Sequence, residues 1–308
     1  MAVPAPPVAA HGPRIGRSLP YAVLAAGVLV VSTAAILIRL AQSQGVPSLA
    51  IAAVRLGLAA LVLLPLAWAR TGRELAALPR RDLLLTAASG AFLALHFWSW
   101  IASLEFTSVA SSTVLVTTNP LWVGLASLVV LRERPPLWVL AGIGLSFGGM
   151  ILTFAADTAA ATASPNPALG NTLALVGAVS ASGYLIIGRA LRARLGLLAY
   201  VALAYGAAAL LLWAGVLWTQ TAMLGHSLLA WSCLVALALG PQLIGHTAFN
   251  WSLRHLSATF VALAILGEPV GSAILAWLIF EERFTALQLA GFGLLLAGIY
   301  LGARGERR

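Results

Sequence analysis

Ten apolar runs, each long enough to cross a lipid bilayer, occupy most of this chain of 308 residues. A transmembrane helix needs about 20 predominantly apolar residues. Only 9% of the residues are charged, against about a quarter in a soluble domain, so the chain cannot cover a water-exposed surface. This excludes a soluble enzyme, a disordered protein and a fibrous repeat, and it predicts an all-α polytopic protein with ten transmembrane helices in the lipid bilayer. The expected spans are 20–42, 47–69, 82–104, 107–131, 136–155, 170–191, 196–218, 229–253, 257–280 and 285–303.

Arginine supplies every basic side chain, since the sequence contains 18 basic residues and no lysine. Without lysine the chain cannot form a Walker A phosphate-binding loop, whose lysine contacts the nucleotide phosphates. ATP is therefore not the expected energy source. The arginines are dispersed between the apolar runs rather than clustered on one soluble face, which argues against nucleic-acid binding.

The arginines also predict the orientation of the chain. With the N-terminus in the cytoplasm, the loops and tails place only Arg283 outside. This is the bias that the positive-inside rule describes. It predicts an even number of spans, both termini in the cytoplasm and a location in the cell (inner or plasma) membrane. The arginines counted as cytoplasmic are Arg14, Arg17, Arg70, Arg73, Arg80, Arg81, Arg132, Arg134, Arg192, Arg194, Arg254, Arg304, Arg307 and Arg308.

The two halves of the chain repeat each other at a separation of 149 positions, as between Pro120 and Pro269 (269 − 120). We call residues paired in this way repeat mates. Each half holds five expected spans, an odd number, so the second half must be inverted relative to the first. Inverted repeats around a midplane site are an architecture of secondary transporters. The predicted segments are a mobile tail 1–19, a first repeat 20–155, a linker 156–169, an inverted repeat 170–303 and a tail 304–308. Further mates are Glu133–Glu282, Arg134–Arg283, Gly142–Gly291, Gly144–Gly293 and Gly149–Gly298, and a separation of 150 pairs Arg39 with Arg189.

Taken together, these features resemble the drug/metabolite transporter superfamily, EamA type. The resemblance covers nearly the whole chain. It rests on the ten spans, the five-plus-five repeat, Pro120 and Pro269, the glutamates Glu133 and Glu282, and the glycine-rich fifth and tenth spans. It implies a ten-helix bundle with a central cavity and alternating access for small metabolites. Export of amino acids is likewise implied by the resemblance and not by the chemistry of the residues.

Pro120 and Pro269 are expected near the middle of the fourth and ninth spans, where they are predicted to break the helix. A proline leaves the carbonyl four residues back without its helical partner, here the carbonyls of Val116 and Ile265. Beside a cavity such a carbonyl can bind a ligand or water. The alternative is a kink that serves only helix packing.

Glu268 precedes Pro269 at mid-membrane, where a carboxylate costs about 2.5–3.5 kcal/mol on insertion scales. Such a residue is a functional candidate, and Glu268 is the predicted proton-coupling residue. Its repeat mate Asn119, a predicted cavity residue, cannot titrate, so proton coupling through this pair would be one-sided. The alternative is a protonated Glu268 that is hydrogen-bonded between helices.

Polar side chains follow one face of the third span and one face of the eighth. Polar groups in lipid must face a partner or water, so the two stripes predict walls of a shared cavity. Simple interhelical hydrogen bonds are the alternative. The sequence has no H-E-x-x-H motif or Cys/His cluster, so no metal site is expected. The stripes are His96, Ser99, Trp100 and Ser103 on the third span, and Gln242, His246 and Asn250 on the eighth.

Aromatic and arginine side chains complete the predicted cavity. Aromatic walls would suit a solute with an apolar or planar part, and lipid-facing bulk is the alternative for each of them. Arg39 and Arg55 could each hold a substrate carboxylate or snorkel to the membrane surface, whereas Arg189 is expected to anchor its span. Of these residues, Arg55 and Tyr184 join the predicted cavity set. The aromatic residues near the stripes are Trp98, Trp100, Trp122, Tyr184, Phe249 and Trp251.

The predicted function is a secondary transporter that carries a small-molecule substrate, needs no cofactor and draws on a gradient, with possible coupling to protons. An uncoupled facilitator or channel of the same fold is the alternative, and an imposed pH gradient distinguishes the two. An intramembrane enzyme would need a nucleophile–base pair or a metal set that these spacings do not assemble, so no enzyme is expected. No oligomeric state is predicted.

Overall fold

The computed structural model describes residues 18–107, 112, 115–158, 166–280 and 285–306. Several predictions from the sequence fall outside the described residues and have no structural account. They concern the tail with Arg14 and Arg17, most of the linker, the loop with Glu282 and Arg283, and the terminal Arg307 and Arg308.

All regular elements in the described part of the chain are helices. The first half forms α1 (Leu19–Val31), α2 (Ala34–Ser43), α3 (Ser48–Ala76), α4 (Arg80–Phe106), α6 (Asn119–Ala126), the π-helix η1 (Ser127–Leu131) and α7 (Leu137–Thr158). The second half forms α8 (Pro167–Arg192), α9 (Leu197–Thr219), α10 (Leu228–Leu237), the π-helix η2 (Ala238–His246), α11 (Thr247–Ser252), α12 (Ala258–Ile265), α13 (Glu268–Phe280) and α14 (Ala286–Glu306).

These helices follow the ten expected spans. Within the described residues, eight helical segments are long and apolar enough to cross a membrane. Two shorter apolar helices, Asn119–Leu131 and Leu137–Leu152, fall in the fourth and fifth spans. Large apolar side chains such as Leu210 and Leu217 are three-quarters exposed, as expected for helices that face lipid. The chain is therefore a multi-pass integral membrane protein, and the predicted fold class is confirmed.

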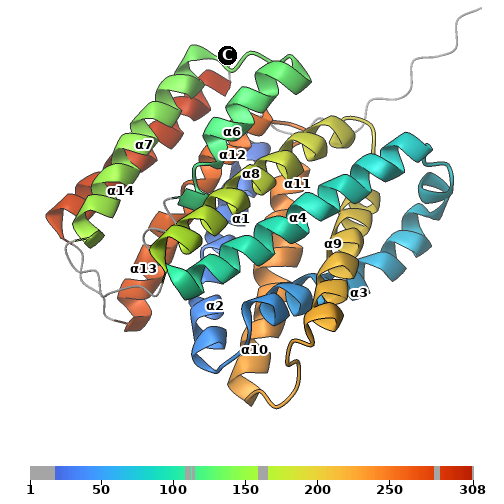
Figure 1. The fold of residues 1–308 in the computed structure, drawn as a ribbon. Coiled ribbons are helices and arrows are strands. Elements are labelled where there is room, and N and C mark those ends of the chain that lie inside the picture. Colours follow the sequence, from blue (N-terminus) through green and yellow to red (C-terminus); the bar gives the residue numbers. More distant parts are fainter. Residues whose placement is uncertain (1–17, 108–111, 113–114, 159–165, 281–284, 307–308) are drawn as a thin grey trace, which may run out of the picture.

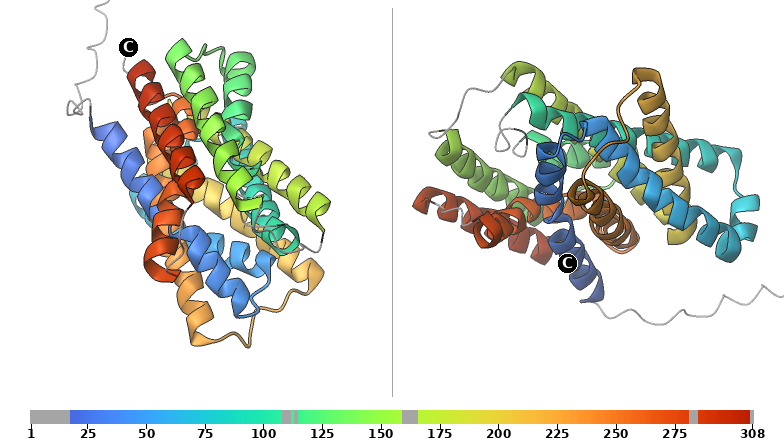
Figure 2. Two further views of the ribbon diagram at one scale, coloured as in Figure 1. Left: turned by 90° about the vertical axis from the view of Figure 1, so that its left-hand side faces the viewer. Right: turned by 90° about the horizontal axis from the view of Figure 1, so that it is seen from below.

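The two halves interlock and do not form separate domains. Figure 1 shows α7 and α14 side by side on one flank, α3 and α9 on the opposite flank, and α1, α8 and α12 between them. The views in Figure 2 also show α7 beside α14. The closest helix pairs, α7 with α14, α4 with α8 and α3 with α9, each take one helix from each half. The core is thus built between the repeats.

Small residues show that the halves are inverted. In α7 and α14, Gly142 meets Gly298 and Gly149 meets Gly291, so the two helices run antiparallel. A Cβ atom added to Gly142 would lie 2.5 Å from the Gly298 carbonyl oxygen. Gly142–Gly291 and Gly149–Gly298 are repeat mates, so replacing both glycines of one contact by their mates gives the other contact. That is the contact pattern of a two-fold interface.

This close approach predicts a position-specific stability effect. A Cβ atom at Gly149 would collide with the Gly291 carbonyl oxygen and the Leu295 backbone, whereas the neighbouring Gly148 faces open space. We expect Gly149→Ala to destabilise the protein by about 1–3 kcal/mol through overpacking. Gly148→Ala, the matched control, should be neutral or slightly stabilising. Thermal unfolding in detergent measures both, and equal midpoints for the two variants would contradict the packing described here.

The fourth and ninth spans are interrupted at their prolines, where the sequence analysis places a break in the helix. In the structure α6 begins at Asn119 and α13 begins at Glu268, so Pro120 and Pro269 occupy the second residue of a new helix. Proline is favoured at that position because the N–H it lacks has no helical partner there in any case.

Two serine hydrogen bonds carry the two-fold relation into the centre of the bundle. Ser32, between α1 and α2, donates from Oγ to the Glu268 carbonyl oxygen (3.3 Å). Ser182 of α8 donates from Oγ to the Asn119 carbonyl oxygen (3.2 Å). Each hydroxyl shares its hydrogen with the carbonyl oxygen four residues earlier, at 2.8 Å in both cases. Asn119 and Glu268 are repeat mates, and Ser32 and Ser182 are separated by 150 positions (182 − 32). The repeat therefore extends to individual hydrogen bonds, and it holds the two interrupted spans against α1 and α8.

Candidate functional site

A pocket of about 60 Å³ lies where these interrupted spans meet. At one water molecule per 10–15 Å³, it has room for about five water molecules or a few heavy atoms of a solute. Both halves contribute to its wall. The predicted cavity residues on the wall are Arg55, His96, Trp100, Asn119, Tyr184, His246 and Glu268. The other lining residues are Val31, Val116, Thr117, Ala181, Leu185, Phe249 and Ile265.

Arg55 of α3 is the central charged group of the pocket. Its side chain is 0% exposed, so it does not snorkel to the membrane surface. Its Nε donates to Gln242 Oε1 (2.8 Å), and its guanidinium carbon lies 4.0 Å from the centre of the Phe97 ring. Nη1 and Nη2 have no partner among the described residues. The guanidinium is thus fixed on one edge, and its two terminal nitrogens remain available.

Gln242 and Asn250 lie behind the wall and not on it. Gln242 holds Arg55 as described. Asn250 donates from Nδ2 to the Tyr184 hydroxyl, to the Tyr205 hydroxyl (3.3 Å) and to the His246 carbonyl oxygen (2.7 Å). Both amides are 0% exposed. They were predicted to line the cavity, and the structure places them where they orient the side chains that do.

Histidine and aromatic rings form one side of the pocket. His96 Nδ1 donates to the Gly177 carbonyl oxygen (2.9 Å), which leaves Nε2 as the acceptor of a neutral ring. The His96 and Trp100 rings lie nearly parallel, with centroids 6.0 Å apart. His246 meets Phe97 edge-on at 5.1 Å and Phe249 at 5.4 Å. These rings are preset by packing, so a planar or apolar group could enter between them without reordering the wall.

Asn119 and Glu268 supply the acceptors of the pocket. Each is the first residue of its helix, and each is fixed through its backbone carbonyl by a serine. Asn119 is 4% exposed, and its Oδ1 has no partner among the described residues. Glu268 is partly buried, and its carboxylate forms no ion pair within the described chain. One carboxylate and one amide oxygen therefore share the wall with the Arg55 guanidinium.

Several predicted residues lie away from the pocket. Ser99 and Ser103 donate to carbonyl oxygens of their own helix, those of Leu95 (2.6 Å) and Trp100 (2.7 Å). Such local bonds satisfy a hydroxyl without a cavity. Trp98 and Trp122 are about 40% exposed on the outside of the bundle, at 43% and 39%. Trp251 packs on His255, with ring centroids 4.4 Å apart.

The other arginines of the spans have different positions. Arg39 is exposed near the end of α2 and is not part of the pocket wall. Arg189 donates from Nη1 to the Leu253 carbonyl oxygen (2.8 Å) and forms an ion pair with Glu133 (3.2 Å). Arg189 thus ties α8 to two other spans, in agreement with an anchoring position.

Tyr205 was missed by the sequence reasoning. It is 0% exposed and shares Asn250 with Tyr184. The repeat offers a signal that could have found it, since Tyr205 and Arg55 are separated by 150 positions (205 − 55). Among the described residues no group of three or more His, Cys, Asp or Glu side chains could hold a metal ion.

Comparisons with known proteins agree with this architecture. The model of the EamA-like transporter family matches residues 19–155 and again residues 168–303. A solved structure, described only as the crystal structure of a protein, is 19% identical, with a TM-score of 0.78 over 95% of this chain and 99% of the other. At that identity it shows the fold alone. No match to a curated protein was found. The family match covers both repeats, so this chain belongs to the EamA-like transporter family.

Proposed function

We propose that this protein is a secondary transporter that exports amino acids, with apolar or aromatic side chains favoured, by alternating access through the central pocket. The proposal rests on one observation, a pocket whose wall holds both hydrogen-bond donors and acceptors. Arg55 offers two terminal nitrogens without a partner, Asn119 offers an Oδ1 without a partner, and Glu268 offers a carboxylate that forms no ion pair in the described chain. A zwitterion has the complementary groups.

The carboxylate of such a solute would bind Arg55. Guanidinium and carboxylate form two parallel hydrogen bonds when both terminal nitrogens are free. Gln242 and Phe97 hold the guanidinium in place, so little side-chain freedom would be lost on binding. A buried donor without a partner costs about 1–3 kcal/mol, and a bound carboxylate would relieve that cost twice.

The ammonium group would face Glu268 and Asn119 Oδ1. A carboxylate and an amide oxygen can both accept from the three ammonium hydrogens. The side chain of the solute would then meet His96, Trp100, Tyr184 and Phe249, whose rings favour apolar or planar groups. A pocket of about 60 Å³ is small for a whole amino acid, which suits a contracted state that must widen during transport.

Proton coupling would follow from competition at Glu268. A proton and a substrate ammonium would bind the same carboxylate, so protonation from outside would release the substrate there. Deprotonation on the cytoplasmic side would restore the site. Asn119, the repeat mate, cannot take a proton, so one site would suffice. In this proposal the protein lies in the cell membrane, and its arginine-rich face is the cytoplasmic side.

An uncoupled facilitator is the second candidate, and one experiment addresses both. Purified protein in liposomes would be tested for counterflow of phenylalanine, of phenethylamine, which lacks the carboxylate, and of 3-phenylpropionate, which lacks the amino group. We expect exchange of phenylalanine only. Failure of all apolar and aromatic amino acids to exchange would overturn the proposal, and exchange that an imposed pH gradient does not drive would favour the facilitator.

A further inference from the structure

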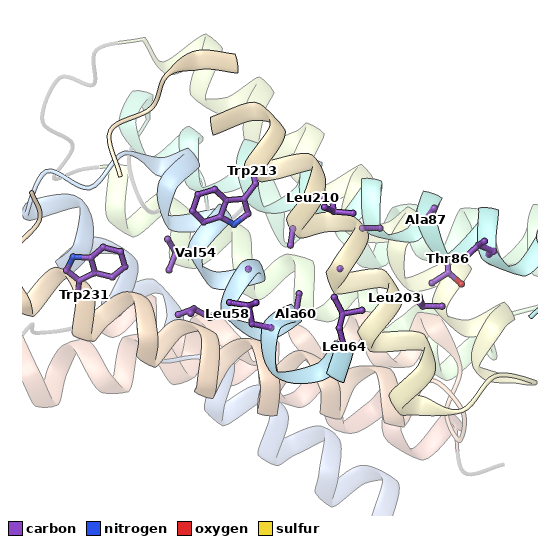
Figure 3. A pocket seen from close by; sticks show the side chains of 16 residues that line it. Val54, Leu58, Ala60, Leu64, Thr86, Ala87, Leu203, Leu210, Trp213 and Trp231 are labelled. Atoms are coloured by element: carbon purple, nitrogen blue, oxygen red, sulfur yellow. The ribbon is translucent and has the colours of Figure 1, made fainter. Parts of the chain in front are cut away.

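A second and larger cavity opens on the side of the bundle, away from the central pocket. It is a groove of about 740 Å³ between α3, α4, α9 and α10. Figure 3 shows Trp213 and Trp231 towards one end and Thr86 and Ala87 at the other. The groove opens sideways, since Leu61 and Leu210 in its wall are more than 70% exposed, at 71% and 75%.

The wall of the groove suits a hydrocarbon chain and no polar solute. Apart from two tryptophans and Thr86, the lining residues are aliphatic or glycine. The Thr86 hydroxyl is already satisfied, because its Oγ1 donates to the Asp82 carbonyl oxygen (2.7 Å). A polar group in this groove would lose its hydration and find only the two indole N–H groups as further side-chain partners.

The walls of the groove on α3 and α9 are long enough to take an acyl chain. On α3 the wall runs from Val54 to Leu64, and on α9 it runs from Leu203 to Trp213. Each stretch rises about 15 Å at 1.5 Å per residue. That is about half of the 30 Å hydrocarbon core of a bilayer. The wall along α3 and α9 is therefore as long as the acyl region of a single leaflet, and the lining residues of α4 and α10 extend the groove beyond it (Figure 3).

Basic residues stand at one end of the groove. Arg80, Leu83 and Ala87 occupy positions i, i+3 and i+7 of α4 and share one helical face. Leu83 and Ala87 line the groove, so Arg80 lies one turn beyond its end. Trp68 of α3, 74% exposed, lies one turn beyond Leu64. Interfacial Trp and Arg mark the level of the lipid headgroups. The exposed arginines nearby in sequence are Arg70, Arg73 and Arg81.

We propose that this groove binds an anionic phospholipid, with one acyl chain along α3 and α9 and its phosphate at Arg80 and the arginines around it. The charge at the end of the groove selects an anionic headgroup over a zwitterionic one, and the apolar wall takes the chain. The site is separate from the central pocket, and its test does not depend on the transported solute.

Native mass spectrometry of the whole protein in detergent tests the proposal, with phosphatidylglycerol and phosphatidylcholine of identical acyl chains as the probes. We expect phosphatidylglycerol to bind at least about tenfold more tightly. The double substitution Arg80→Gln and Arg81→Gln should abolish that preference, whereas Arg134→Gln, at another exposed arginine, should keep it. Equal binding of the two lipids by the unaltered protein would overturn the proposal.

A second pair of variants tests the groove itself. Ala87 is exposed and lines the groove, whereas Ala214 is exposed on α9 outside it. Ala87→Phe should weaken binding of both lipids several-fold, and Ala214→Phe should leave it unchanged. A cooperative thermal unfolding transition in each variant is the check that both are folded. Unchanged lipid binding by Ala87→Phe would overturn the proposal. The proposal would also be overturned if the unaltered protein gave a dimer peak in the mass spectrum and Ala87→Phe did not. In that case the occupant of the groove would be a second copy of the chain.

Discussion

Arg55→Gln is expected to lower the affinity for an amino acid at least about 100-fold while the protein stays folded. Each hydrogen bond to a charged group contributes about 1.5–3 kcal/mol, and 1.4 kcal/mol is a factor of ten. Two such bonds would be lost with the guanidinium. Stability should hold or rise, because a fully buried charge whose terminal nitrogens are unpaired is costly in the empty protein. Binding of radiolabelled phenylalanine and thermal unfolding in detergent measure the two effects.

Two further variants separate the effect of the guanidinium geometry from the effect of the positive charge. Arg55→Lys keeps the charge without the planar fork, and we expect it to recover only part of the affinity. Arg39→Gln changes an exposed arginine outside the pocket, and we expect it to bind as the unaltered protein does. If Arg55→Gln bound phenylalanine with undiminished affinity, Arg55 would not hold the substrate.

Glu268→Gln is expected to abolish the response to a pH gradient. Glutamine keeps an oxygen that can accept from an ammonium group but cannot exchange a proton. We therefore expect counterflow to persist at reduced affinity, while an inward proton gradient no longer accelerates export. Export from liposomes with and without an imposed gradient measures the difference.

The matched control for that experiment is Glu105→Gln. Glu105 is an exposed carboxylate at the end of α4 and is not in the pocket wall. It should retain the full response to the gradient. Should Glu268→Gln also export phenylalanine with the full response, proton coupling would run through another group or be absent.

Much of the architecture was predictable because a polar side chain within the bilayer must face a polar partner or water. His96, Asn119, Tyr184, His246 and Glu268 are polar positions within apolar runs, and the structure brings all five to one pocket. The repeat predicted the inversion, because five spans per half admit no other connection. These inferences rest on the cost of polar groups in hydrocarbon, which depends little on side-chain packing.

The sequence did not predict how close each side chain lies to the cavity or toward which neighbour it points. A helical stripe fixes a face but does not say which residue reaches the cavity, so Gln242 and Asn250 were placed on the wall that they support from behind. Ser99 and Ser103 satisfy themselves on their own backbone. The form of the break at Pro120 also depends on how neighbouring spans take up the freed backbone, which no local pattern encodes.

The scaffold is more symmetric than its chemistry. Phe97 and His246 are repeat mates (246 − 97 is 149), and their rings contact each other across the two halves. Yet one mate is apolar and the other can bind a proton. Asn119 and Glu268 also differ, since the amide cannot take up a proton and the carboxylate can. A two-fold frame with unlike side chains is what a solute with two different ends requires.

Protection of a cysteine in the pocket tests the central claim most directly. The single cysteine, Cys233, is buried in α10, and Cys233→Ala supplies a background without thiols. On it, Ala181→Cys places a thiol on the pocket wall and Ala222→Cys places one in an exposed loop. We expect saturating phenylalanine to slow labelling of Ala181→Cys by a small methanethiosulfonate about tenfold, with no change at Ala222→Cys. If the Ala181→Cys variant transported phenylalanine but was labelled equally fast in its presence and absence, the solute would bind elsewhere.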